Sequence, residues 1–252
     1  MDMINFKIQG KTRPCDVWLY PTSNLELKNL NLESFDIVIC DGPYGLVPPY
    51  DVEVAGYDCE WDSFVLSSKK GAQEFRDYYR TLFNMVIPYM NSTSSLFIFG
   101  FPEGMNIVKD LLDTEFDLNF RRSIAWAYKN HYDFDRGLNF HRSHETILYY
   151  TKTKDFIFKS GGVRDVINLP VALRETNVIP DGAKPLNIVE FLLDASYKPG
   201  GRLLSLFGGS GTDLVVATEY DMDAVGFEFN PLNVKVISDR LRNKGGNYDS
   251  IS

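Results

Sequence analysis

The stretch RLLSLFGGSGTDLVVATEYDMDAVGFE, residues 202–228, carries the strongest fold signal in this chain of 252 residues. A short apolar run, residues 202–207, leads into a glycine-rich turn and then into a segment with helical spacing. A second short apolar run follows at residues 224–228. This order predicts a strand, a tight turn, a helix and a second strand parallel to the first.

The turn and the acid that follows it indicate a nucleoside site. Gly208, Gly209 and Gly211 would allow positive φ angles and a close approach of a ligand to the backbone. Glu228 ends the second strand, where a carboxylate can accept both hydroxyls of a ribose. A merely structural tight turn is the alternative. The phosphate-cradling G-x-x-x-x-G-K-S/T pattern is missing from the sequence, which favours a nucleoside without a phosphate chain.

Strand-like and helix-like segments alternate along the rest of the chain. Residues 35–40 and 95–100 are apolar and rich in β-branched and aromatic side chains, and residues 73–90 between them have helical spacing. Residues 184–197 predict a helix with Pro185 in its first turn, and residues 230–241 predict a helix capped by Asn230. The sequence therefore predicts one α/β domain, residues 1–252, with a mostly parallel sheet covered by helices.

Composition is that of a globular protein, with 44% apolar and 24% charged residues. No apolar run reaches the length of a membrane span, and the first residues lack the apolar stretch of a secretory signal. Three cysteines without metal-ligand spacing indicate reduced thiols and no metal site. We therefore expect a cytoplasmic protein that contacts no membrane.

Charge is distributed unevenly. Residues 120–164 contain nine Lys and Arg against four acids, a net charge of +5 within a chain of net charge −8. This basic segment is either a solvated surface with chance clustering or a face for a polyanion. In the second interpretation its aromatic residues, Trp126, Tyr128, Tyr132 and Phe134, would meet bases.

A second motif follows the strand predicted at residues 35–40. The stretch FDIVICDGPYGL, residues 35–46, runs from the strand into Asp41, Gly42, Pro43 and Tyr44. These four residues suit a pocket that grips a flat nitrogenous ring, because they offer a carboxylate, a rigid turn and an aromatic face. An ordinary strand-to-turn junction with a partly buried tyrosine is the alternative.

Together these motifs resemble the β-type DNA amino-methyltransferases, which use S-adenosylmethionine. Residues 41–44 resemble their D/N/S-P-P-Y/F motif, LFGGSGT their F-x-G-x-G motif and AVGFEFNP their ribose-binding motif. The resemblance covers residues 20–243 and implies a Rossmann-like class I methyltransferase fold with a mostly parallel seven-stranded sheet and helices on both faces. It also implies a set of cofactor-binding residues: Asp41, Lys184, Pro185, Phe207, Gly208, Gly209, Ser210, Gly211, Thr212, Glu228 and Asn230.

The resemblance implies a role for each residue of the catalytic motif. The Asp41 side chain and the Gly42 carbonyl would accept the hydrogens of the target amine as it gains positive charge. Pro43 would hold the turn, and Tyr44 would stack on a base flipped out of the duplex, with a dispensable hydroxyl. The implied contacts to nucleic acid are Trp126, Arg136, Arg142 and His144, and residues 45–70 would form a mobile loop beside the site.

The sequence departs from the family pattern at three places. Gly42 replaces the first proline, and Thr22 or Asn24 stands where an upstream Gly-Asp is usual. The stretch IPDGAKP, residues 179–185, stands where the family commonly has His-Pro-Thr-Gln before Lys-Pro. Aspartate in the first motif position favours N6 of adenine in DNA as the target. The alternatives are N4 of cytosine, an RNA substrate, and a non-catalytic subunit that binds nucleic acid or a partner chain. A bacterial or phage restriction-modification setting and a possible homodimer follow from the same resemblance.

Overall fold

The computed structural model describes residues 3–45, 66, 69–128, 143–159, 161–170, 183–244 and 247–251. Its strands are β1 (Met3–Gln9), β2 (Pro14–Tyr20), β3 (Phe35–Cys40), β4 (Met90–Gly100), β5 (Asn119–Ala127), β6 (His144–Thr151), β7 (Val166–Asn168), β8 (Arg202–Ser205), β9 (Asp223–Phe227) and β10 (Asn247–Ile251). Its helices are η1 (Asn24–Asn29), α1 (Lys69–Val86), η3 (Ile87–Tyr89), α2 (Pro102–Glu115), α3 (Leu186–Ser196), α4 (Thr212–Glu219) and α5 (Pro231–Asn243).

These strands form one sheet in the order β10-β1-β2-β9-β8-β3-β4-β6-β5-β7. The neighbours β2, β9, β8, β3 and β4 run parallel, whereas β6 is antiparallel to both β4 and β5. The predicted parallel centre is confirmed. The predicted count of seven strands is wrong, because the described strands number ten. The additional strands extend both edges, with β1 and β10 at one edge and β7 at the other.

The hairpin of β1 and β2 was missed although its sequence carries the signal. Alternate side chains are buried, with Phe6 and Ile8 on β1 and Val17 and Leu19 on β2. Such period-two burial is the mark of a strand that covers a core on one face. Cys15 lies in the same row, and burial raises the pKa of its thiol, as expected for a structural cysteine.

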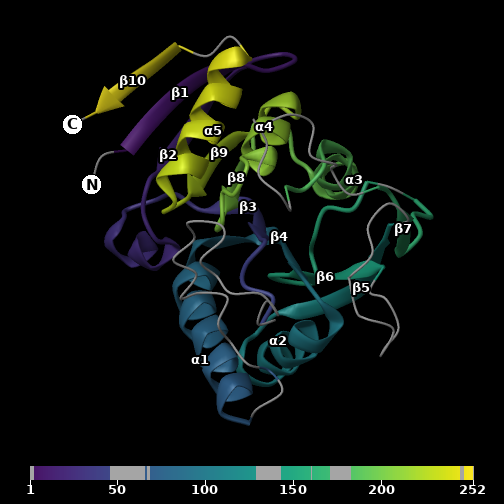
Figure 1. Ribbon diagram of the computed structural model, residues 1–252. Helices are drawn as coiled ribbons and strands as arrows, with labels where there is room; N and C mark the ends of the chain where they lie inside the picture. The colour runs from purple at the N-terminus through teal and green to yellow at the C-terminus, as the bar shows by residue number, and fades with distance from the viewer. Residues whose placement is uncertain are drawn as a thin grey trace.

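Helices cover both faces of the sheet (Figure 1). One core packs α1 and α2 against the sheet, and the other packs α3, α4 and α5 against its opposite face. All six residues of β3 are buried because the strand is covered on both sides. In the described ranges no helix is long and apolar enough to span a bilayer.

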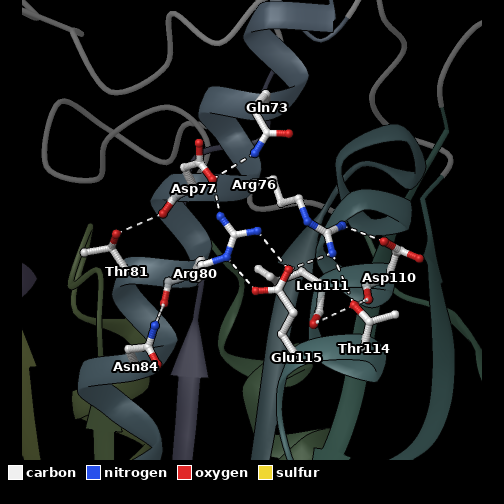
Figure 2. Close-up of polar contacts among 10 residues, drawn as sticks. All are labelled: Gln73, Arg76, Asp77, Arg80, Thr81, Asn84, Asp110, Leu111, Thr114 and Glu115. Atoms are coloured by element: carbon white, nitrogen blue, oxygen red, sulfur yellow. Dashed lines mark hydrogen bonds and ion pairs between the residues drawn. The ribbon is translucent and has the colours of Figure 1, made fainter.

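An ionic cluster joins α1 to α2 (Figure 2). The carboxylate of Glu115 accepts from Arg76 Nη2 at 3.0 Å and from Arg80 Nη2 at 2.8 Å. Arg76 also pairs with Asp110. Hydrogen bonding by Arg80 is the main cause that lowers the pKa of Glu115 to about 2. This cluster fixes α1, which in turn supports the catalytic motif, because Tyr79 Oη donates to the Pro43 carbonyl at 2.9 Å.

Candidate active site

The two predicted motifs meet at the centre of the sheet. β3 and β8 are parallel neighbours, with Val38 opposite Leu204. The chain continues from β3 to β4 on one side and from β8 to β9 on the other, so strand order reverses between β3 and β8. Ligands of open α/β sheets bind beyond the carboxyl ends of the strands at such a reversal. Asp41 follows β3 there, and Phe207 follows β8.

The glycine turn has the backbone that its sequence predicts. Gly209 and Gly211 have φ angles of 51° and 77°, in the left-handed region that favours glycine. Gly208 is confined for another reason, because a β-carbon there would lie 3.0 Å from Ile237 Cδ1. The turn therefore requires these glycines for backbone conformation and for close packing.

Glu228 lies beside this turn and holds it. Its Oε2 atom accepts from Gly209 N at 2.7 Å, and its Oε1 atom accepts from Asn230 N at 2.7 Å. The residue is only 7% exposed, and burial raises the pKa of its carboxyl although these N–H donors oppose the shift. The Asn230 side chain caps α5 by accepting from Leu232 N. Asn230 thus contributes its backbone N–H to the acid and its side chain to the helix.

Lys184 and Thr212 connect the start of α3 to the glycine turn. Thr212 Oγ1 donates to the Lys184 carbonyl at 2.8 Å. Pro185 is the cap residue of α3, one position before the first helical turn in which it was predicted. Arg240 on α5 donates to the Ser210 carbonyl at 2.6 Å and so supports the same turn from the other side.

The predicted catalytic motif forms a compact polar cluster. Tyr44 Oη lies 2.7 Å from Asp41 Oδ1, 2.8 Å from Glu145 Oε2 and 2.7 Å from Lys184 Nζ. Lys184 Nζ also pairs with Asp41 Oδ2 at 2.9 Å. The Tyr44 ring packs edge-on against Phe101, with centroids 4.7 Å apart. Asp41 thus stands at the mouth of the site with both carboxylate oxygens engaged.

Gly42 fits where a proline would not. A β-carbon at this position would lie 2.8 Å from Tyr79 Oη and 2.9 Å from Phe207 Cε2. The predicted catalytic loop therefore packs directly on Phe207, the first residue of the cofactor motif, and leaves little room for a side chain at Gly42. Asn24, one of the two predicted substitutes for the upstream acid, lies beside the same turn and donates to the Leu206 carbonyl at 3.0 Å.

Comparison with known proteins assigns the family. The model of a family described as DNA methylase, the N6 and N4 methyltransferases, matches residues 35–178. This chain belongs to that DNA methylase family. Among relatives of this methylase is the Type II methyltransferase M.HpaI of Haemophilus parainfluenzae, 24% identical over 250 residues, which cover 89% of this chain and 74% of the relative.

Solved structures share the fold of this methylase. The M1.HpyAVI–SAM complex superposes with a TM-score of 0.63 at 16% identity, over 89% of this chain and 99% of that one. The cytosine-N4-specific PvuII DNA methyltransferase superposes with a TM-score of 0.69 at 13% identity, over 94% of this chain and 95% of that one. The methylase therefore has the predicted Rossmann-like class I fold.

The predicted nucleic-acid residues of the methylase lie in different environments. Trp126 is 1% exposed, and its Nε1 donates to the Leu169 carbonyl at 2.8 Å, which is at odds with a direct base contact. Its burial follows from the alternation of Ile124 and Trp126 along β5, continued by Tyr128 just after the strand, which puts all three on the covered face. His144 is half-buried at the start of β6. Arg136 and Arg142 lie outside the described residues.

Part of the basic segment lines a pocket of about 430 Å³ away from Asp41. Arg121, Arg122 and Arg164 lie on its wall, and the Arg121 guanidinium is 3.7 Å from the centre of the Phe156 ring. The predicted mobile loop, residues 45–70, lies outside the described residues except for Gly45, Leu66 and the start of α1.

Three polar residues of the site were missed from the sequence. Glu145 follows His144 in a strand and has no recognisable spacing to Asp41. Asp213 lies beneath the glycine turn, where burial raises the pKa of its carboxyl to about 7 although Ser205 Oγ donates to it at 2.9 Å. Arg240 is the third. Each belongs to a different element, and only the folded sheet brings them together.

Proposed function

We propose that this DNA methylase transfers a methyl group from S-adenosylmethionine to the exocyclic N6 amine of adenine in DNA. The observation that carries the proposal is the placement of Asp41 and the glycine turn on adjacent parallel strands at the point where strand order reverses. A methyl donor in the turn and an amine at the carboxylate would meet there.

The cofactor fits the donor and acceptor set around the turn. S-adenosylmethionine supplies an electrophilic methyl group on a sulfonium sulfur. Glu228 accepts the backbone N–H groups of Gly209 and Asn230 on different oxygens, and the same carboxylate would accept the ribose hydroxyls. Gly209 has nothing within 4 Å of a β-carbon position, which leaves its outer side open to a ligand. Phe207, Gly208, Ser210, Gly211, Thr212 and Asn230 would hold the shape of this turn, and Asn24 offers a neutral group beside it.

Asp41 would act on the target amine. The lone pair of an exocyclic amine is delocalised into its ring, and the nitrogen gains positive charge as it attacks a methyl group. An anionic oxygen fixed against one N–H stabilises that charge in the transition state. Lys184 and Tyr44 hold the two oxygens of Asp41 in place, and each oxygen retains room for a further hydrogen bond. The Gly42 carbonyl would accept the second amine hydrogen.

Tyr44 would present its ring to a flipped base, while its hydroxyl serves Asp41. The sequence predicted a dispensable hydroxyl. Its hydrogen bonds with Asp41, Glu145 and Lys184 support a role in holding Asp41 instead. The ring rests against Phe101, and Pro43 is fixed by Tyr79, so the stacking surface is held on a rigid support.

Aspartate in the first motif position supports adenine as the target. N4 of cytosine is the second candidate, and the likeness to the cytosine-N4-specific PvuII enzyme supports it. The basic segment, residues 120–164, with Arg136, Arg142 and His144, would meet the phosphate backbone. A homodimer or a partner subunit would add any recognition surface that this chain lacks.

The test is methyl transfer by the purified protein. Unmethylated genomic DNA and methyl-labelled S-adenosylmethionine would be incubated with it, and the digested nucleosides identified by mass spectrometry. We expect N6-methyladenine. N4-methylcytosine would move the target to the second candidate. If the labelled methyl group appears in RNA and not in DNA, the proposed substrate is RNA. No transfer to either polymer would overturn the proposal and support a non-catalytic binding subunit.

A further inference from the structure

We propose that Glu145 is a positioning residue of this site, acting as an uncharged acid that holds the Tyr44 hydroxyl and, through it, Asp41. The inference deepens the proposed methyl transfer and rests on it for its catalytic consequence. The protonation state of Glu145, on which the inference depends, can be measured without an activity assay. Glu145 belongs to β6, which lies between β4 and β5, and it pairs with Trp126 on β5.

A count of hydrogens shows that one carboxyl in the cluster is protonated. Tyr44 Oη is 2.7 Å from Asp41 Oδ1 and 2.8 Å from Glu145 Oε2, and both distances are hydrogen bonds between oxygens. A phenol has one hydrogen and can serve only one of these contacts as donor. Lys184 Nζ, at 2.7 Å, also donates to Tyr44 Oη. The remaining oxygen–oxygen contact needs a hydrogen that a carboxylic acid supplies.

Lys184 is charged in this arrangement. Burial lowers the pKa of its ammonium, but its carboxyl partners, with Asp41 the strongest, outweigh that effect and raise the pKa above its ordinary value. The ammonium therefore acts only as a donor to Tyr44 Oη. It does not supply the hydrogen that the second contact between Tyr44 Oη and a carboxyl oxygen needs.

The proton belongs on Glu145. Lys184 Nζ lies 2.9 Å from Asp41 Oδ2 and 3.4 Å from Glu145 Oε2, so the ion pair favours the charged form of Asp41. The Glu145 side chain is 10% exposed against 23% for Asp41, and burial is the main cause that raises the pKa of Glu145. With Glu145 neutral, Asp41 and Lys184 cancel, and the buried cluster has no net charge.

The resulting order of donation sets the orientation of the catalytic carboxylate. Glu145 donates to Tyr44, and Tyr44 donates to Asp41. Of these three side chains, only Asp41 is then an anion. Among the described residues, Asp213 below the glycine turn is a further titratable group that faces this cluster. Loss of Glu145 would free the Tyr44 hydroxyl and loosen Asp41 without touching the cofactor turn. Charging Glu145 would put a second anion beside Asp41.

The experiment compares Glu145→Gln with Glu145→Ala. Glutamine keeps the shape, has no charge and offers an N–H donor to Tyr44, so we expect it to lose at most about threefold in kcat. Alanine should lose at least about tenfold in kcat, the scale of one hydrogen bond to a charged group, with an unchanged Kd for S-adenosylmethionine. In the Tyr44→Phe background, Glu145→Ala should cost little more, because the path through the hydroxyl is already broken. Glu33→Gln, an exposed acid with 87% of its side chain accessible, is the matched control.

A measurement independent of activity keeps the two proposals apart. Carbon-13 NMR of protein labelled at the glutamate carboxyl carbons, with the Glu145 signal assigned by its loss in Glu145→Gln, should show a protonated carboxyl at pH 7. An ionised Glu145 at pH 7 overturns the inference, and so do equal kcat losses in the glutamine and alanine variants. If the wild-type protein transfers no methyl group, the proposed function is overturned. The NMR measurement still shows whether Glu145 is protonated.

Discussion

Gly42 and Phe207 are packed so closely that a β-carbon on Gly42 would lie 2.9 Å from the Phe207 ring. The contact joins the catalytic loop to the cofactor turn. Gly42→Ala should therefore displace the ring or the loop, with a loss of about 1–3 kcal/mol in the free energy of unfolding. Thermal unfolding and methyl transfer would measure the effect. Gly161→Ala, where a β-carbon meets nothing within 4 Å, is the control and should change neither. A stable, active Gly42→Ala would contradict the packing.

Asp41, which the family resemblance also placed among the cofactor-binding residues, should be essential for turnover and contribute little to cofactor affinity, because its proposed partner is the target amine. Asp41→Ala should slow methyl transfer by a factor on the order of a hundred or more, because a transition-state contact is lost. Calorimetry with S-adenosylmethionine should give an unchanged Kd. Some loss of stability is expected as well, because Lys184 would remain buried without its nearest ion-pair partner. Full activity in this variant would remove Asp41 from the mechanism.

Glu228 should control cofactor binding. Glu228→Ala removes the acceptor for two backbone N–H groups and for the ribose hydroxyls. We expect the affinity for S-adenosylmethionine to fall at least about tenfold, since a hydrogen bond to a charged group is worth roughly 1.5–3 kcal/mol. Calorimetry would measure it. Unchanged affinity would mean that the carboxylate only supports the turn.

DNA binding should weaken steeply with salt if the basic segment faces the backbone. Each neutralised phosphate adds about 0.9 to the slope of log affinity against log salt. Removing the charges of Arg136 and Arg142 should flatten this slope by about one to two units and leave cofactor affinity unchanged. Lys235 and Lys244, on and after α5, are the control pair. Fluorescence anisotropy with duplex DNA would measure both, and a salt-independent wild type would argue against a solitary enzyme.

The Glu115 cluster should make stability depend on pH. The pKa of Glu115 is lowered to about 2 from an ordinary 4.5, so its contribution is present above about pH 4.5 and is lost as pH falls toward 2. Glu115→Gln should therefore be less stable than wild type at pH 7 and equal to it near pH 2. Glu74→Gln, which breaks only the exposed pair with Lys70, should have little effect at either pH. Denaturant unfolding across this range would test the difference.

The sequence predicted the parallel centre of the sheet and the place of both motifs, because those signals are local. Apolar periodicity marks each central strand, and the positive φ angles of Gly209 and Gly211 require glycine. The charge and aromatic content around Trp126 predicted a contact with bases, whereas the alternation along β5 indicates burial, as the structure has it. Glu145 could not be found by spacing, since its partners Tyr44 and Lys184 come from two other segments and meet it only in the folded sheet.

The adjacency of β3 and β8 also bears on the order in which the chain folds during synthesis. β3 can pair with β4 once the first 100 residues have emerged, but its other edge stays open until β8 has been made. All six residues of β3 are apolar or buried in the finished sheet, so this open edge is prone to pair with other chains. β8 completes that edge, and the cofactor turn follows directly after β8. A truncated product that ends before residue 202 would contain Asp41 and Tyr44. It would lack the cofactor turn, and it would also lack β8, the strand that protects the edge of β3 from aggregation.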